Sequence, residues 1–149
     1  MSDLRTFGAR IKLIGKNLET NADKLKRRVA LAVDAAVVMA TPVDTGRARA
    51  NWQVETDGPA VGTIPVFYEG KSGTTSGQNA QAAIDQGQKV IEAARAGQAF
   101  HITNNLPYIG GLNDGYSAQA PAGFVQKAVR EGIDVVHSAV GLLDTPRGK

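Results

Sequence analysis

The sequence has no cysteine, few aromatic residues and no long apolar run. Without cysteine the chain has no disulfide, no thiolate metal site and no thiol nucleophile. Aromatic residues make up only 5% of the chain, which leaves few rings for stacking on nucleic-acid bases. No apolar stretch approaches the roughly 18 residues that a membrane-spanning helix needs. These absences exclude a disulfide-stapled miniprotein and a thiol enzyme, and they predict no membrane span.

The remaining composition is that of an ordinary globular domain, with 149 residues, 42% of them hydrophobic and 21% charged. This length predicts one domain with a core of useful size. We expect the segments to be a long helix at 1–40, a turn and strand at 41–56, a loop and inserted helix at 57–98, a strand, loop and C-terminal helix at 99–143, and a frayed tail at 144–149.

The first helix is the clearest element. Apolar residues recur three and four positions apart from Leu4 to Met39, and Pro42 ends the pattern. A helix of this length would be about 57 Å long, which exceeds the size of a compact domain of 149 residues. The helix therefore either breaks near Asn17 to Asn21 or projects and packs on another subunit. We favour a long helix with a weak point there.

Two segments alternate in the manner of half-buried strands. Residues 48–55, which include the only tryptophan, Trp52, predict one strand, and residues 99–104 predict a second. Two strands are too few for an independent sheet, so we expect a third strand within 57–70 or completion of the sheet by a neighbouring subunit. The turn-rich stretch from Thr41 to Gly46, where Asp44 and Thr45 can bond the backbone, precedes the first strand.

The predicted fold class is α+β, with the N-terminal and C-terminal helices packed on a small antiparallel sheet. A Gly-rich loop and an extra helix at 79–96 are inserted between the strands. The last helix is expected from Pro121 to about Leu143, and Gly132 on its apolar side predicts close approach to another backbone. The predicted core anchors are Trp52, Phe100 and Phe124.

The sequence contains no pattern typical of an active site. His101 and His137 stand apart, without a third residue at the spacing of a metal site. Scattered carboxylates give no reason to expect an acid–base pair. We therefore predict that the protein is not an enzyme and needs no metal, cofactor or small-molecule substrate.

Charge is unevenly spread, with a net +5 in residues 1–50 and −2 in residues 51–149. One basic cluster on the first helix could contact packaged DNA or an acidic partner, although the solvated side of a helix, with i,i+4 ion pairs, is the explanation that the pattern favours. The cluster consists of Lys24, Lys26, Arg27 and Arg28.

Two loops are candidate interfaces. Loop 104–123 combines tyrosines with asparagines and glycines, a composition that suits either a protein-docking surface or a well-capped connection. Segment 57–78 is rich in glycine and long enough to reach a neighbour. The candidate subunit or partner contacts in these loops are Phe67, Tyr68, Tyr108, Leu112, Asn113, Asp114 and Tyr116.

Two stretches carry a resemblance to a known family. The first is Thr41-Pro-Val-Asp-Thr-Gly-Arg-Ala-Arg-Ala-Asn-Trp52, and the second runs from Ile102-Thr-Asn-Asn-Leu-Pro-Tyr-Ile109 through Leu112-Asn-Asp-Gly115 to Val125. Together with the long basic helix, their order resembles the neck or tail-completion proteins of long-tailed bacteriophages. The likeness covers residues 1–56 and 99–143. Residues 112–115 depart from the acidic-Gly-Thr pattern of the family, which marks a subgroup variant.

This resemblance implies a structural virion protein of the head–tail junction, assembled in the cytoplasm of the bacterial host. It implies a ring of identical subunits, a hexamer, around the DNA channel, with a head-side connector or stopper protein and a tail-tube or terminator protein as partners. The 104–120 and 57–78 loops would then be two different patches of a head-to-tail interface.

Two alternatives remain open. A tail-terminator ring that caps the tail tube would have the same general features, because similarity of fold does not separate the two roles. A non-specific nucleic-acid-binding module would instead bind DNA as an isolated monomer, with a steep dependence on salt.

Overall fold

The computed structural model describes residues 3–43, 46–65 and 67–144, and it confirms the α+β class. The expected turn at Asp44 and Thr45 and most of the C-terminal tail (145–149) lie outside the described residues. In chain order the described elements are α1 (Asp3–Ala40), α2 (Arg47–Ala50), β1 (Trp52–Glu55), α3 (Ser76–Ala93), β2 (His101–Asn104), α4 (Ile109–Asn113) and α5 (Phe124–Asp144).

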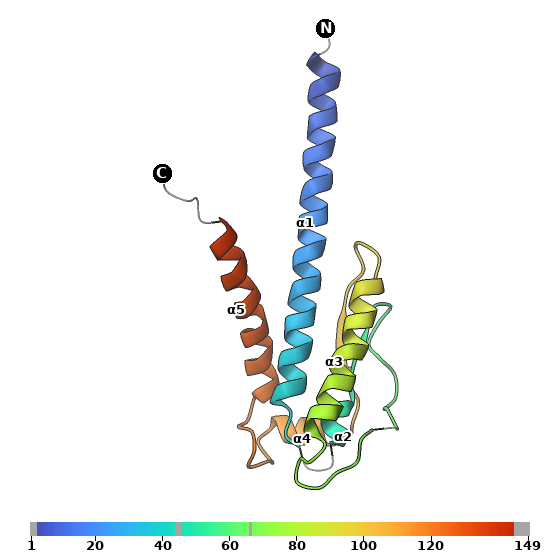
Figure 1. Ribbon diagram of the computed structural model, residues 1–149, viewed down its shortest axis with the longest axis vertical. Coiled ribbons are helices and arrows are strands. Elements are labelled where there is room, and N and C mark those ends of the chain that lie inside the picture. The colour runs from blue at the N-terminus through green and yellow to red at the C-terminus, as the bar shows by residue number, and fades with distance from the viewer. Residues whose placement is uncertain (1–2, 44–45, 66, 145–149) are drawn as a thin grey trace.

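Helix α1 is continuous over 38 residues, so the predicted weak point near Asn17 to Asn21 is not a break. Its N-terminal part extends past the ends of α3 and α5 in Figure 1. The helix ends where Thr41 precedes Pro42, because a proline disfavours helical backbone in the residue before it. Thr41 closes the last turn by donating its hydroxyl to the carbonyl of Val37 at 2.6 Å.

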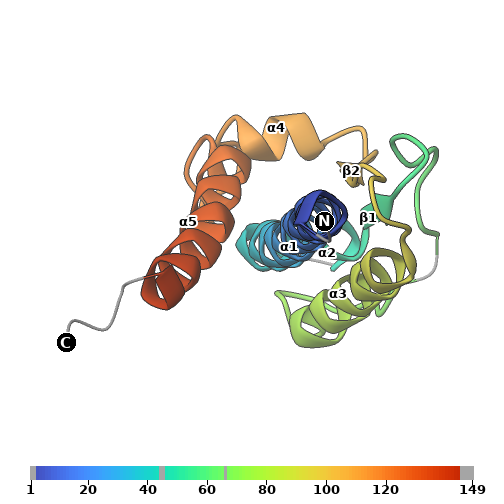
Figure 2. The same ribbon diagram turned by 90° about the horizontal axis from the view of Figure 1, so that it is seen from above.

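Helix α1 is the centre of the molecule, with α3 and the sheet on one side and α5 on the other (Figure 2). The main core forms where these elements meet and includes Val37, Val38, Trp52, Ala80, Ala83 and Ala128. Helix α5 packs mainly against α1 rather than on the sheet, where the sequence had suggested that both terminal helices pack. It is connected to the sheet through the core cluster that contains both Ala128 and Trp52. Gly132 of α5 touches the α1 backbone, as the sequence predicts: a Cβ there would lie 2.8 Å from Val33 Cα.

The two strands of the described sheet pair antiparallel, with Trp52 opposite Asn104 and Val54 opposite Ile102. Trp52 and Val54 face the core. The outer edge of β1 is closed by the side chain of Gln86 from α3, which accepts from the Val54 N–H at 3.1 Å and donates to its carbonyl at 3.2 Å. A side-chain amide thus takes the place of a neighbouring strand at that edge.

The first strand is shorter than predicted, because residues 48–50 belong to the helical turn α2. Alanine favours helix over strand, and Gly46 supplies the positive φ of 92° that precedes this turn. Asn51 secures the end of the turn by donating its amide to the carbonyl of Arg47 at 2.8 Å.

No third strand is found among the described residues of 57–70, so that prediction is wrong there. Side-chain amides order the segment instead. Asn51 accepts from the Ile64 N–H at 2.7 Å, and Asn105 donates to the carbonyls of Ala60 and Gly62 at 2.7 and 2.9 Å. Backbone groups that a third strand would have paired are thus bonded by side chains.

Other boundaries differ by a few residues. Helix α3 begins and ends three residues earlier than expected, and α5 begins at Phe124 rather than near Pro121. The short helix α4 was not predicted, because its sequence Ile-Gly-Gly-Leu-Asn contains two residues of low helix propensity.

Candidate functional site

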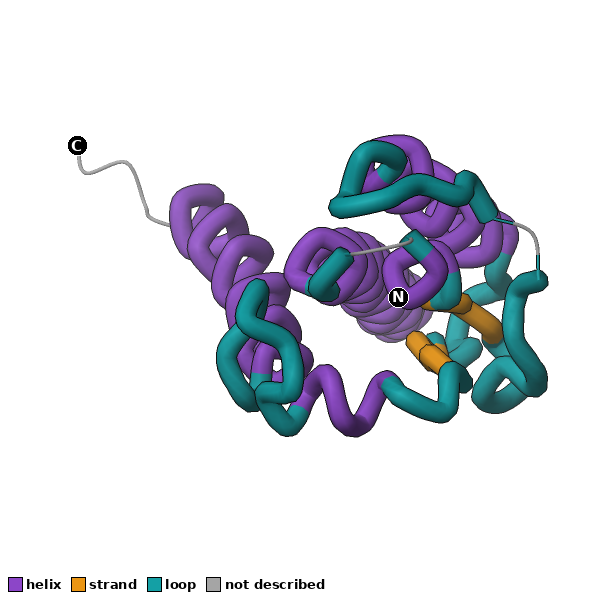
Figure 3. Tube along the Cα trace, turned by 90° about the horizontal axis from the view of Figure 1, so that it is seen from below, coloured by secondary structure: helices purple, strands orange, loops and turns teal. Residues whose placement is uncertain are grey.

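Parts of both predicted interface loops lie at the end of the molecule that holds α2 and α4, which is the lower end in Figure 1 and is seen from below in Figure 3. Phe67 from the first loop and Tyr108 from the second line one open groove of about 610 Å³. Arg47, Glu69 and Lys71 lie around it. The loops therefore form one composite surface rather than two separate patches.

The first loop is held from beneath by the buried amide of Asn79. This side chain accepts from the Tyr68 N–H at 2.9 Å and donates to the Tyr68 carbonyl at 2.7 Å, while Thr75 donates its hydroxyl to the same carbonyl at 2.7 Å. Gly46 leaves room for Asn79, since a Cβ there would collide with its amide. Tyr68 itself is 55% exposed, so the loop presents its ring from a fixed backbone.

A second groove of about 320 Å³ lies beside the first, and Tyr108 lines both. Leu112 and Val43 form part of its apolar lining. Gln119 fixes the approach of the two chain segments, because it accepts from the Val43 N–H and donates to the Val43 carbonyl, both at 2.8 Å.

Asn113 has a structural position rather than an exposed one. Its side-chain oxygen accepts from the Val125 N–H at 3.0 Å, and its main-chain carbonyl accepts from the Gly123 N–H at 2.6 Å. Asn113 therefore caps the start of α5. This is the capped-connection alternative for that residue. Asp114 and Tyr116 are exposed, and the Tyr116 ring lies over Gly111, where no side chain intervenes. Tyr116, at 84% exposure, is the most prominent aromatic residue of this surface.

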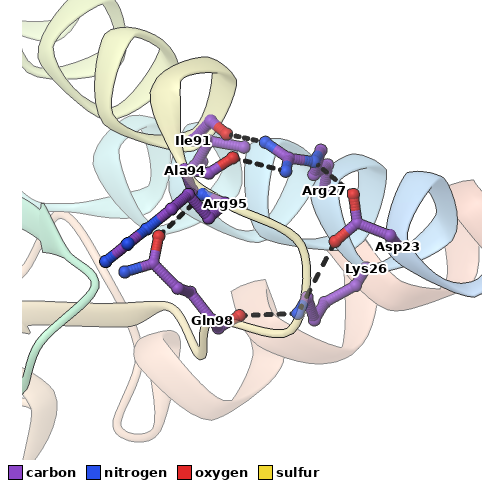
Figure 4. Close-up of polar contacts among 7 residues, drawn as sticks. All are labelled: Asp23, Lys26, Arg27, Ile91, Ala94, Arg95 and Gln98. Carbon is purple, nitrogen blue, oxygen red and sulfur yellow. Dashed lines mark hydrogen bonds and ion pairs between the residues drawn. The ribbon is translucent and has the colours of Figure 1, made fainter. Parts of the chain in front are cut away.

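The predicted basic cluster is divided by its contacts. Arg27 donates to the carbonyls of Ile91 and Ala94, the latter at 2.6 Å, and to Asp23 at 2.7 Å (Figure 4). The carbonyls belong to the C-terminal end of α3, where a cation is favoured by the helix dipole. The hydrogen bond from Arg27 also holds the pKa of Asp23 below its usual range.

Lys26 is also engaged within the chain. Its ammonium group donates to the Gln98 carbonyl at 2.5 Å and lies 5.6 Å from the centre of the Phe100 ring. Lys26 and Arg27 therefore connect α1 to the end of α3 and to the α3–β2 connection, which makes them weaker candidates for contact with a partner. Lys24 and Arg28 are exposed, and the hypothesis of DNA or acidic-partner contact rests on these two.

Replacing Arg27 with methionine is expected to lower the free energy of unfolding by about 1.5–3 kcal/mol, because charge-assisted bonds to α3 are lost. Arg27→Lys should recover only part of this, since an ammonium group cannot reproduce the forked geometry. Urea denaturation measures the change, and the neighbouring exposed Arg28→Met is the matched control. Equal stabilities for the Arg27 and Arg28 variants would contradict the assignment.

The three predicted core anchors differ in burial. Trp52 and Phe124 are buried, and the Trp52 indole donates to the Thr41 hydroxyl at 2.7 Å. Phe100 is half-buried against the smaller core cluster that contains Val54 and Ile91.

Sequence reasoning missed the amides that pair with the backbone. Asn51, Asn79, Gln86 and Gln119 each accept from an N–H and donate to the carbonyl of one distant residue. The sequence contains no signal for Asn51, because the alternation of residues 48–55 places it on the polar side of the predicted strand, whereas its side chain is buried. The partners of the four amides could not be identified from the sequence, because each lies in irregular backbone or across the fold.

Within the described part of the chain no group of three or more His, Cys, Asp or Glu side chains could hold a metal ion. His101 lies in β2 and His137 in α5. Among the same residues, no helix is long and apolar enough to cross a membrane.

Comparison with known proteins finds no match to a protein-family description, to a curated protein or to a solved structure.

Proposed function

We propose that the chain is a structural subunit of the bacteriophage head–tail junction, which assembles into a ring around the DNA channel. In this role it joins a head-side connector or stopper to a tail-tube or terminator protein, and it works in the virion without catalysis.

The observation that carries the proposal is that the two stretches with the family resemblance pack on each other. Asn104 donates to the Ala48 carbonyl at 2.9 Å, and Gln119 pairs with the backbone of Val43. Residues separated by more than 50 positions thus form one unit, which positions Tyr108 beside two grooves. Such an arrangement favours a scaffold for protein contacts over a catalytic centre.

The shape of the chain adds support. Helix α1 extends beyond the rest of the molecule (Figure 1), and Ile11 within the extension is 53% exposed. The apolar repeat of the sequence continues through this extension, and an apolar stripe on a projecting helix is typical of a surface that a neighbour covers. A ring of head-to-tail contacts supplies such a neighbour to every copy.

The mass of the purified protein in solution, measured by native mass spectrometry with and without DNA, tests the proposal. A closed assembly, with six copies of the 15.6 kDa chain expected, supports it. A stable monomer that binds DNA with a steep salt dependence would overturn it in favour of the nucleic-acid module. Binding to isolated tail tubes rather than connectors would assign the ring the terminator role.

Neutralising the exposed basic pair is expected to change DNA binding by the assembled protein. In the double variant Lys24→Gln with Arg28→Gln, the slope of log affinity against log salt should become shallower by about two, because each cation releases about one counterion. Filter binding over a salt series measures the slope. The control is Lys89→Gln with Arg95→Gln, which removes two exposed charges, one in α3 and one in the connection that follows it. Identical slopes in the two double variants would show that Lys24 and Arg28 do not meet DNA.

A further inference from the structure

The apolar stripe of α1 continues past the end of the helix that covers it. Helix α5 packs along the C-terminal part of α1, where Gly132 meets the backbone of Ala32 and Val33. On the same helical repeat the stripe continues towards the N-terminus through Leu18, Ile14, Ile11, Phe7 and Leu4. Ile11 is 53% exposed and Leu25 is 41% exposed. The two stripe residues whose side chains the structure describes here, Ile11 and Leu25, are therefore largely uncovered.

The charge of this segment indicates what kind of surface can cover it. Residues 3–21 carry four basic and two acidic side chains, so two copies of the segment would repel each other. Arg10, beside Ile11, is exposed. The expected acceptor is thus a helix face with exposed apolar surface and acidic neighbours.

Helix α5 offers such a face on one of its flanks. Glu131, Asp134 and Val135 are spaced i, i+3, i+4 and therefore share one side of the helix, and all three are exposed. Val135 is 66% exposed, which is unusual for a valine in a helix that packs on the core. Lys127 offsets part of the charge through an ion pair of 3.9 Å with Glu131, and Asp134 remains as the acidic neighbour of Val135. The opposite flank carries the exposed Ile133 beside Arg130, without this acidic pair.

We propose that the projecting N-terminal segment of α1 (residues 3–21) in one copy docks on the Glu131–Asp134–Val135 flank of α5 in the next copy. This contact rests on the proposed ring and specifies one of its interfaces. Donor and acceptor are different surfaces, so the contact is head-to-tail and leaves a free donor and a free acceptor on every pair. Repetition of the contact closes a ring where the rotation from one copy to the next divides a full turn evenly, as the proposed ring requires.

The test uses single substitutions in the full-length chain, followed by sedimentation velocity over a range of concentrations. Ile11→Asp in the donor and Val135→Asp in the acceptor are each expected to weaken self-association roughly 10- to 100-fold, as loss of one buried aliphatic contact predicts. Ile133→Asp, on the other flank of α5, is the matched control and should leave association unchanged. Circular dichroism melts establish that all three variants fold, which their exposure predicts.

Mixing the variants tests the head-to-tail geometry. Ile11→Asp retains an intact acceptor and Val135→Asp retains an intact donor. An equimolar mixture should therefore form a heterodimer at concentrations where each variant alone is monomeric, and nothing larger. A mixture that stays monomeric would overturn the proposal. Loss of association in Ile11→Asp but not in Val135→Asp would also overturn it and indicate pairing between two α1 segments.

The outcomes separate this contact from the ring itself. Intact rings in both Ile11→Asp and Val135→Asp overturn the contact and leave the ring proposal standing. A wild-type protein that remains monomeric at all concentrations overturns both. A wild-type protein that stops at a dimer overturns both the head-to-tail contact and the ring, because a head-to-tail pair keeps one free donor and one free acceptor and would continue to grow.

Discussion

As the pH is raised from 4 to 8, the free energy of unfolding of the Asp34→Asn variant is expected to rise by about 4 kcal/mol relative to that of the wild type. Asp34 lies in α1 at 1% exposure, against Gly87 of α3 and Val54 of β1. Its Oδ1 has no hydrogen-bond partner among the described residues. Loss of solvation on burial raises the pKa of this carboxyl from 3.8 to about 7.

The direction of this change with pH follows from the number of protons that the native and unfolded states bind. Between about pH 4 and pH 7 the native state holds a proton on Asp34 that the unfolded state has lost, so the free energy of unfolding of the wild type falls as the pH rises. Above pH 7 the carboxylate is charged in both states and the loss is complete. Asparagine does not titrate, so the variant lacks this fall.

Urea denaturation of both proteins at several pH values measures the difference. The unpaired amide of the variant adds an offset that does not depend on pH, and subtraction of the pH 4 value removes it. The pKa of Asp23 is lowered by its bond to Arg27, so the ionised carboxylate stabilises the protein except at acid pH. Because this pair is present in both proteins, its contribution cancels in the difference between their free energies of unfolding. A difference that stays constant from pH 4 to pH 8 would contradict the buried, protonated state of Asp34.

Substitution of Gly132 is expected to weaken the packing of α5 on α1. A Cβ at this position would lie 2.8 Å from both the Cα and the N atom of Val33, and backbone atoms cannot move aside as a side chain can. Gly132→Ala should therefore destabilise the protein by about 1–3 kcal/mol, although alanine normally stabilises a helix interior by up to about 1 kcal/mol. Gly132→Leu should cost more.

The matched control is Gly77→Ala in α3, where a Cβ meets no atom within 4 Å. This variant should be neutral or slightly stabilised in a thermal melt. If both alanine variants raise the melting temperature, the close approach of α1 and α5 is not as tight as the structure describes.

The sequence predicted the elements whose pattern is periodic. The stripe of α1, the apolar side of α5 and the alternation around Trp52 each predicted an element that the structure contains. Gly132 could also be interpreted correctly, because a glycine on an apolar helix face has few other uses. These features are local, and a single segment contains all the information that specifies them.

The features that the sequence did not predict depend on partners far along the chain. Arg27 is one of four basic residues in a short stretch, and nothing in that stretch indicates that it bonds the end of a helix more than 60 positions away. The loop near Ile64 contains apolar residues typical of a strand, but the Asn51 amide pairs with its backbone instead. A short pattern cannot reveal whether a strand or a side chain will satisfy a backbone group.

The bonds of the Gln86 amide to β1 also affect how readily the folded protein can aggregate. Sheets with two open edges can add strands indefinitely, which is the route to fibrils. Here the β1 edge is occupied at Val54, so growth of the folded sheet is restricted to β2. Self-pairing through β2 would end with two chains, since each chain brings only one available edge. A concentrated solution of the folded chain is thereby protected against open-ended polymerisation through its sheet.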